Sequence, residues 1–98
     1  MDTLEKIRVT NVGSDRATLT VDFDDGRTVS LPLMWFPRLH HATQKQRDHW
    51  QLIGRGFGVH WPDVDEDLSA KGLALGRPSV EFLRKPSRRP VKRQKQAA

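Results

Sequence analysis

The fold of this chain is decided by residues 18–31, TLTVDFDDGRTVSL. In this stretch Leu19, Val21 and Phe23 alternate with polar residues before an acidic turn that contains glycine, and the alternation continues after the turn. A period of two residues places the apolar side chains on one face of a half-buried strand. The stretch therefore predicts two antiparallel strands joined by a tight turn.

The length of this turn decides which side chains face each other across the two strands. A two-residue loop would place the apolar Val21 opposite the polar Ser30 on a single face. A three-residue loop over residues 24–26 pairs Val21 with Val29 instead and keeps the apolar face intact. We therefore predict the three-residue loop, with its glycine in the left-handed conformation of a bulged turn.

A further strand is expected before this hairpin, and the second strand of the hairpin should continue beyond it. The first strand directs Ile7 and Val9 to the apolar face and ends in a turn at residues 13–15. The last strand continues the alternation as far as Leu33. The first third of the chain therefore predicts a three-stranded antiparallel meander.

Helical signals follow the meander. Pro37 suits the first turn of a helix and predicts a helical turn over residues 37–42. Residues 43–46 have the form of a capping box, and the apolar spacing predicts a helix near residues 44–52 that packs Trp50 onto the sheet. Two glycines beyond residue 53 should end this helix.

The remainder of the body predicts one strand and one helix. Residues 57–61 read as a short fourth strand stopped by a proline, and residues 68–75 read as a final short helix. The predicted fold is α+β: a three-stranded meander plus one short strand, two short helices and a disordered basic C-terminal tail. We assign residues 1–80 to the compact domain and residues 81–98 to the tail.

Composition limits the class of protein. A chain of 98 residues has room for one domain, and a large enclosed substrate cavity is not expected in so small a body. The sequence contains no cysteine, which excludes disulfides, thiolate nucleophiles and zinc sites with cysteine ligands. No apolar run approaches the roughly 20 residues of a membrane span, so we expect a soluble, cytoplasmic protein. We also expect no cofactor.

The charge is distributed unevenly along the chain. Residues 1–76 carry nine Lys/Arg and eleven Asp/Glu, a net charge of −2, whereas residues 77–98 carry eight Lys/Arg and one Glu, a net charge of +7. A basic tail of this kind can bind nucleic acid without sequence specificity, although it can also serve solubility or contact an acidic partner. The candidate nucleic-acid-binding residues are Arg84, Lys85, Arg88, Arg89, Lys92, Arg93 and Lys95.

Aromatic side chains provide a candidate surface for a protein partner. Trp35, Phe36 and Trp61 border prolines, so partial exposure is expected there, whereas Trp50 and Phe57 are expected in the core. Acidic residues that follow the third tryptophan could complement a basic partner. The candidate partner-binding residues are Trp35, Phe36, Arg38, Trp61, Asp63, Asp65, Glu66 and Asp67.

The same acidic residues, together with His60, are the feature of the sequence that most resembles an enzyme. Carboxylates and an imidazole could hold a metal ion or share acid and base roles. Their spacing, however, fits no calcium-binding loop or zinc motif, and helix capping and solvated surface explain these residues better. We therefore assign no catalytic residue and no metal site, and we expect no enzymatic activity.

Several segments of the chain resemble a known family. These segments are Leu31-Pro32-Leu33, Trp35-Phe36-Pro37-Arg38-Leu39, Trp50 through Gly54, Gly56 through Pro62, Asp63 through Leu68, Gly72-Leu73 and Gly76. Together they are similar to the bacterial family catalogued as domain of unknown function 2442, over roughly residues 4–80. The tryptophan–proline pair at residues 61–62 followed by acidic residues is the most specific part.

The resemblance implies a small α+β domain with no assigned enzymatic activity. Members of the family are often encoded beside a small protein of the unknown-function family numbered 4160, in an arrangement that looks like a toxin–antitoxin pair. Other members carry the domain ahead of a helix-turn-helix, for which this chain has too little apolar sequence after Gly76.

Three functional hypotheses follow. The first is a protein-binding module, an antitoxin-like or regulatory partner of a small protein encoded by the adjacent gene. The second is a regulatory protein that contacts DNA or RNA through the basic tail. The third, which we favour least, is a metal-dependent enzyme centred on His60 and the acidic residues.

Overall fold

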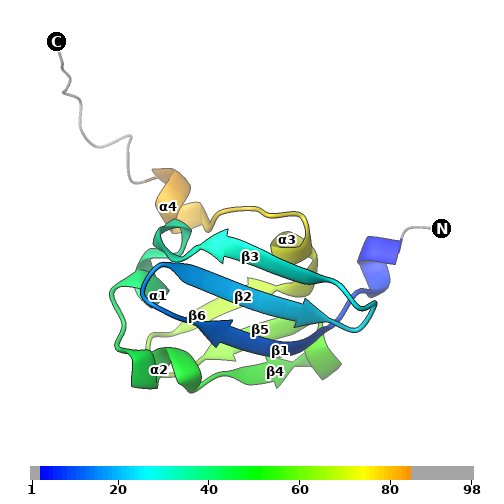
Figure 1. The fold of residues 1–98 in the computed structure, drawn as a ribbon, viewed down its shortest axis with the longest axis horizontal. Coiled ribbons are helices and arrows are strands. Elements are labelled where there is room, and N and C mark those ends of the chain that lie inside the picture. Colours follow the sequence, from blue (N-terminus) through cyan, green and yellow to red (C-terminus); the bar gives the residue numbers. More distant parts are fainter. Residues whose placement is uncertain (1–2, 85–98) are drawn as a thin grey trace, which may run out of the picture.

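The computed structural model describes residues 3–84 of the chain. Within these residues six strands form two three-stranded antiparallel sheets, with orders β1-β2-β3 and β4-β5-β6, and the first sheet lies in front of the second in Figure 1. The strands are β1 (Val9–Ser14), β2 (Thr18–Phe23), β3 (Thr28–Pro32), β4 (Gln51–Ile53), β5 (Gly58–Trp61) and β6 (Glu66–Ser69).

Short helices connect the strands and cover the ends of the sheets. The α-helices are α1 (Pro37–His40), α2 (Gln44–Asp48), α3 (Ala70–Ala74) and α4 (Val80–Arg84). The 3-10 helices are η1 (Thr3–Lys6), η2 (Leu33–Trp35) and η3 (Gly54–Gly56). The predicted α+β class is therefore confirmed, with two sheets where the sequence predicted one. No helix within residues 3–84 has the length and apolar character needed to cross a membrane.

The predicted hairpin is confirmed in its register. Val21 lies opposite Val29 and Leu19 lies opposite Leu31, as the three-residue loop requires. Gly26 has a φ angle of 93°, in the region that glycine adopts without steric cost. The apolar face of this hairpin supplies much of the core.

The first strand departs from a simple alternation. A bulge between Val9 and Asn11 shifts the register, so Val9 and Val12 are both buried although they lie three residues apart. The turn predicted at residues 13–15 begins later, because β1 continues to Ser14. The Asp15 carboxylate accepts two backbone N–H groups of that turn at 2.8 Å each.

The second sheet corrects two helix predictions. The capping box that starts α2 is present, but the helix ends at Asp48, and residues 51–53, predicted as helix, form β4 beside β5. Likewise Leu68, predicted to lie in the final helix, pairs with Val59 in β6, and α3 begins only at Ala70. In both places pairing with β5 outweighs the local helical spacing.

The core is centred on two aromatic side chains, Trp61 and Phe36, both with 0% exposure. The indole N–H of Trp61 donates a hydrogen bond to the Arg47 carbonyl at 3.1 Å. Arg47 is itself buried, and its guanidinium donates to the Ala42 carbonyl at 2.6 Å and to the Ser14 hydroxyl at 3.1 Å. These contacts join β5, α2, the end of α1 and β1.

The body extends beyond the predicted boundary at residue 80. Residues 81–84, assigned to the tail from sequence, lie in α4, and the Phe82 ring packs beside the Trp35 ring with centroids 6.5 Å apart. The Ser79 hydroxyl donates to the Trp35 carbonyl at 2.9 Å and accepts the Phe82 backbone N–H. These contacts hold α4 against η2, at the top of Figure 1.

Two tryptophan substitutions test this core. Trp61→Phe removes the hydrogen bond to a buried carbonyl and leaves a void, so it should lower the free energy of unfolding by about 2 to 3 kcal/mol. Trp35→Phe, at a partly exposed site, should cost less than about 1 kcal/mol. Urea denaturation of the two variants measures the difference, and equal losses would contradict the assignment of Trp61 to the core.

Candidate functional site

The aromatic residues that were predicted to form a partner-binding surface are mostly buried. Phe36 and Trp61 were predicted to be partly exposed, and this prediction is wrong because both side chains are fully buried. Trp61 lies on the central strand β5 with its ring turned inward, and Phe36 turns inward between η2 and α1. Trp35 is partly buried against Phe82. None of the three therefore offers an open aromatic face to a partner.

Phe57, which was predicted to lie in the core, is 42% exposed. It adjoins a shallow cavity of about 460 Å³ that Ile53 and Leu68 also line. The Arg8 guanidinium lies over its ring, 4.8 Å from the centroid, in a cation–π contact. Ile53 of β4 is exposed as well, so Phe57 and Ile53 form an apolar surface beside this cavity.

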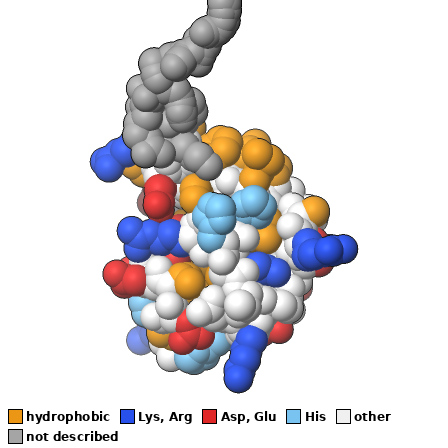
Figure 2. All heavy atoms as spheres, turned by 90° about the vertical axis from the view of Figure 1, so that its left-hand side faces the viewer, with side chains coloured by type: hydrophobic (Ala, Val, Ile, Leu, Met, Phe, Trp, Pro, Cys, Tyr) orange, Lys and Arg blue, Asp and Glu red, His pale blue; other side chains and the backbone are white. Residues whose placement is uncertain are grey.

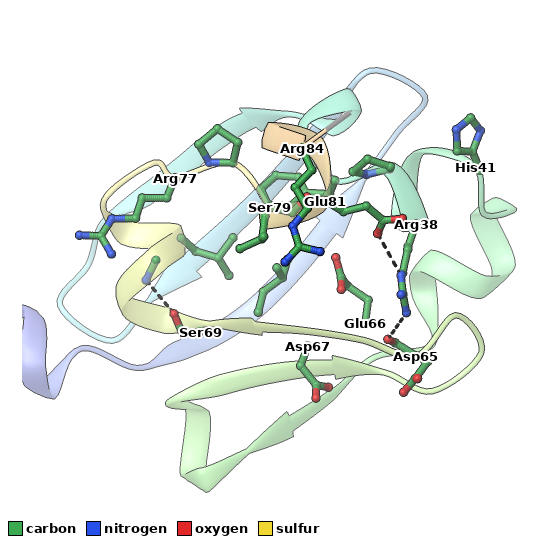
Figure 3. A pocket seen from close by; sticks show the side chains of 17 residues that line it. Arg38, His41, Asp65, Glu66, Asp67, Ser69, Arg77, Ser79, Glu81 and Arg84 are labelled. Atoms are coloured by element: carbon green, nitrogen blue, oxygen red, sulfur yellow. Dashed lines mark hydrogen bonds and ion pairs between the residues drawn. The ribbon is translucent and has the colours of Figure 1, made fainter. Parts of the chain in front are cut away.

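Five of the predicted partner-binding residues line one groove: Phe36, Arg38, Asp65, Glu66 and Asp67. This groove, here called the β6 groove, has a volume of about 1340 Å³. Its walls are β6 and the start of α3 on one side and α1 and α4 on the other (Figure 3). Asp63 does not belong to it, because its carboxylate lies 3.0 Å from the Nδ1 atom of His49.

Sequence reasoning missed a second group of groove residues, Arg77, Ser79 and Glu81. They follow Gly76, where the body was expected to close, and Glu81 was placed in the tail. One signal was present in the sequence, since Ser79 precedes three residues that suit a first helical turn, and it caps α4 through the Phe82 N–H.

An ion pair closes one end of the β6 groove. The Arg38 Nε atom lies 3.0 Å from Glu81 Oε1, and its Nη1 atom donates to the Asp65 carbonyl at 2.9 Å. The hydrogen bond to Glu81 raises the pKa of the Arg38 guanidinium further above its ordinary value. Asp65 has a φ angle of 54°, an uncommon conformation for this residue type that the bond from Arg38 supports.

Glu66 is the carboxylate that points into the middle of the groove, facing the side of α4 (Figure 3). Burial raises its pKa above the ordinary 4.5, and the charge of Glu81 raises it further, while Arg38 acts in the opposite direction. Burial therefore outweighs the attraction of Arg38 in setting this pKa. The lining of the groove carries the carboxylates of Asp65, Glu66, Asp67 and Glu81 together with the guanidinium groups of Arg38, Arg77 and Arg84.

One backbone edge of β6 also faces the groove. The Ala70 N–H donates to the Phe57 carbonyl at 2.8 Å, and the antiparallel register places Leu68 in the next pair that is hydrogen-bonded to β5. The backbone groups of Asp67 and Ser69 therefore point away from β5. Since both residues line the β6 groove, this edge of the strand forms part of its wall.

The acidic residues and His60 do not converge on one point. His60 contacts the Asp67 carboxylate through Nδ1, while Asp63 contacts His49 on its own. Within residues 3–84 no group of three or more His, Cys, Asp or Glu side chains is placed to hold a metal ion. The arrangement thus gives no support to the metal-enzyme hypothesis.

The candidate nucleic-acid-binding residues lie almost entirely outside the described part of the chain. Arg84 lies at the end of α4 and lines the β6 groove. The other six, Lys85, Arg88, Arg89, Lys92, Arg93 and Lys95, fall outside the described residues. On the face of the body shown in Figure 2, acidic and basic side chains are interspersed, and the described residues form no continuous basic patch there.

Two small antiparallel sheets, short helices and an open groove define a compact α+β domain. The chain belongs to the family described as protein of unknown function (DUF2442), whose model matches residues 9–79. The family resemblance inferred from the sequence is therefore confirmed. A search of curated proteins found no match.

Solved structures share the fold. A crystal structure of a protein of unknown function from Rhodospirillum rubrum is 31% identical, with a TM-score of 0.64, and the match covers 76% of this chain and 93% of that one. The solution structure of an uncharacterized protein from Chromobacterium violaceum also has a TM-score of 0.64, at 21% identity, covering 80% of this chain and 74% of that one. At that lower identity the likeness concerns the fold alone.

The raised pKa of Glu66 predicts a specific dependence of stability on pH. Ionised Glu66 destabilises the folded state, so the wild-type chain should lose stability relative to Glu66→Gln as the pH rises from 4.5 through the raised pKa. Asp25 is a control of opposite sign, because Arg27 lowers its pKa below 3.8. The wild-type chain should gain stability relative to Asp25→Asn as the pH rises through that lower range.

Urea denaturation at several pH values measures both differences, and an NMR titration of the side-chain carboxyl carbons gives the two pKa values directly. A Glu66 carboxyl that titrates at or below the ordinary value would contradict the assignment of this residue to a desolvated position in the groove.

Proposed function

We propose that this protein is a non-enzymatic protein-binding module, and that it binds its partner in the β6 groove. The proposal rests on one observation, the open groove of about 1340 Å³ into which the half-buried carboxylate of Glu66 points. A groove of this size is large for a body of fewer than 100 residues. A binding role explains why the chain retains a partly buried acid that costs stability.

The composition of the groove supports a polypeptide partner. Leu68, partly buried, and Val80, exposed, contribute apolar lining, while other lining residues carry charges of both signs and the polar edge of β6. Protein interfaces combine an apolar centre with a polar rim in the same way. The open shape suits a chain segment that lies along the groove better than it suits an enclosed small molecule.

The charges of the groove define which partner residues would fit. Glu66 and Asp67 on the β6 side favour Lys or Arg side chains, and charge complementarity selects partners and speeds their association. A partner cation next to Glu66 would supply the compensation that Arg38, already bound to Glu81, gives only in part. The small protein encoded by the adjacent gene is the first partner to test, with this chain acting as its antitoxin-like or regulatory counterpart.

Co-expression tests the proposed module and its site. The chain and the product of the adjacent gene should elute together in size-exclusion chromatography. Glu66→Lys should weaken the affinity measured by calorimetry at least about tenfold, because it places like charges against each other. Asp25→Lys makes the same charge change at the β2–β3 turn, outside the groove, and should leave the affinity close to that of the wild type.

The outcomes separate the partner from the site. If the two proteins elute separately, the proposed partner is wrong. If they bind and Glu66→Lys has no more effect than Asp25→Lys, the partner uses another surface. Phe57→Ser then examines the apolar surface that Phe57 forms with Ile53.

A further inference from the structure

We propose that the β6 groove binds the chain's own C-terminal segment, residues 85–98, when no other protein occupies it. This inference goes beyond the proposed function and does not depend on it, because it concerns the isolated chain. It rests on where the described chain ends, on the charge of the segment that follows, and on the lining of the groove.

The described chain ends at the groove itself. Arg84, the last residue of α4, lines the groove, and its side chain extends from α4 toward the space in front of β6 (Figure 3). Fourteen residues follow Arg84. Fully extended, they could reach roughly 46 to 50 Å, so the length of the segment does not prevent it from lying along the groove.

The charges of the segment and of the groove are complementary. Residues 85–98 contain six Lys or Arg residues and no Asp or Glu. On the β6 side, Glu66 points toward α4, whereas the Asp67 side chain points to the other side of the strand, where it contacts His60 and is 66% exposed (Figure 3). The cation nearest these acids on the α1 side, Arg38, is held by Glu81 and the Asp65 carbonyl. Additional cations for this wall can therefore come from the C-terminal segment.

The chemical character of the segment also suits this groove. Pro86 and Pro90 disfavour helix and favour an extended backbone, which is the shape that can lie beside a strand edge. Arginine and lysine can place their methylene groups on exposed apolar lining such as Val80 while their charged ends reach carboxylates. Charge-assisted hydrogen bonds to Glu66 would be stronger than neutral ones.

Covalent attachment makes weak contacts sufficient. A segment joined to the rim of its own site is present there at an effective concentration in the millimolar range, so a few charge pairs can hold it. A basic segment from another protein would then have to displace residues 85–98 before it could bind. The segment thus acts as an internal competitor for the groove, in addition to any contact that it makes with other molecules.

Paramagnetic NMR on the full-length chain tests the proposal. Since the sequence has no cysteine, Val91→Cys introduces a single attachment point for a nitroxide label. Relaxation enhancement falls steeply with distance, so it should be largest for the amides of Asp67, Leu68 and Gly72 and smallest for Asn11 on β1. At about 1 M salt, where the Debye length is about 3 Å, the enhancement at the groove should fall severalfold.

Isosteric variants supply the matched control. Glu66→Gln with Asp67→Asn removes two charges from the groove without changing side-chain size, and it should reduce the enhancement at Gly72 severalfold. Asp24→Asn with Asp25→Asn removes two charges from the β2–β3 turn and should leave the enhancement unchanged. The amide spectrum of each double variant is recorded first, because amide shifts like those of the wild type show that the variant is folded.

Three results would overturn the proposal. One is enhancement of similar size at Asn11 and at the groove amides. A second is enhancement that the groove variant and the turn variant reduce equally. The third is enhancement that appears only between labelled and isotope-labelled molecules in a mixture, which would place the segment in the groove of another copy. The first result, together with salt-sensitive binding of a duplex DNA probe that is lost when the six cations are replaced by Gln, would assign the segment to nucleic acid.

Discussion

The structure depends on the buried contact between Trp61 and Arg47. Trp61 lies in the central strand of the second sheet, and its indole N–H donates to the carbonyl of Arg47, while the Arg47 guanidinium binds Ala42 and Ser14. A buried arginine is costly unless its donors are satisfied, and here carbonyl and hydroxyl acceptors satisfy them. Since these acceptors come from α1, α2 and β1, this one cluster fixes how the second sheet meets the first.

The geometry of the groove follows from that cluster. Trp61 pairs with Glu66 in the β5–β6 register, so the position that fills the core also sets the position of the groove carboxylate. On the opposite wall, Ser79 and Phe82 attach α4 to Trp35, which places Glu81 next to Arg38. The groove is therefore the space between two elements that are each fixed by core contacts.

The sequence predicted those elements whose structure depends on residues close together in the chain. It failed where the structure depends on contacts between residues far apart in the chain. The 18–31 hairpin and the capping box of α2 follow from residues close in the chain, and both were predicted. Trp61 and Phe57 were assigned the wrong way round. In a strand over residues 57–61 both would share one face, but β5 begins only at Gly58, and Phe57 lies at the end of η3 with helical backbone angles. Arg38 and Glu66 were chosen as site residues, but Glu81 was not, since its ion pair with Arg38 spans 43 positions in sequence.

The edge of β6 that faces the groove is open to other chains but carries charged groups. An open strand edge invites pairing with other chains, and proteins often place charged side chains there to prevent it. The Arg38 guanidinium binds the Asp65 carbonyl just before β6, and Glu66 and Asp67 place carboxylates on the first half of the strand, so charged groups of the chain itself guard this part of the edge. An uncharged strand would have to displace these groups without replacing their interactions. A basic segment that binds the Glu66 carboxylate where it lies, as proposed above, would not have to break the contact between Arg38 and the Asp65 carbonyl.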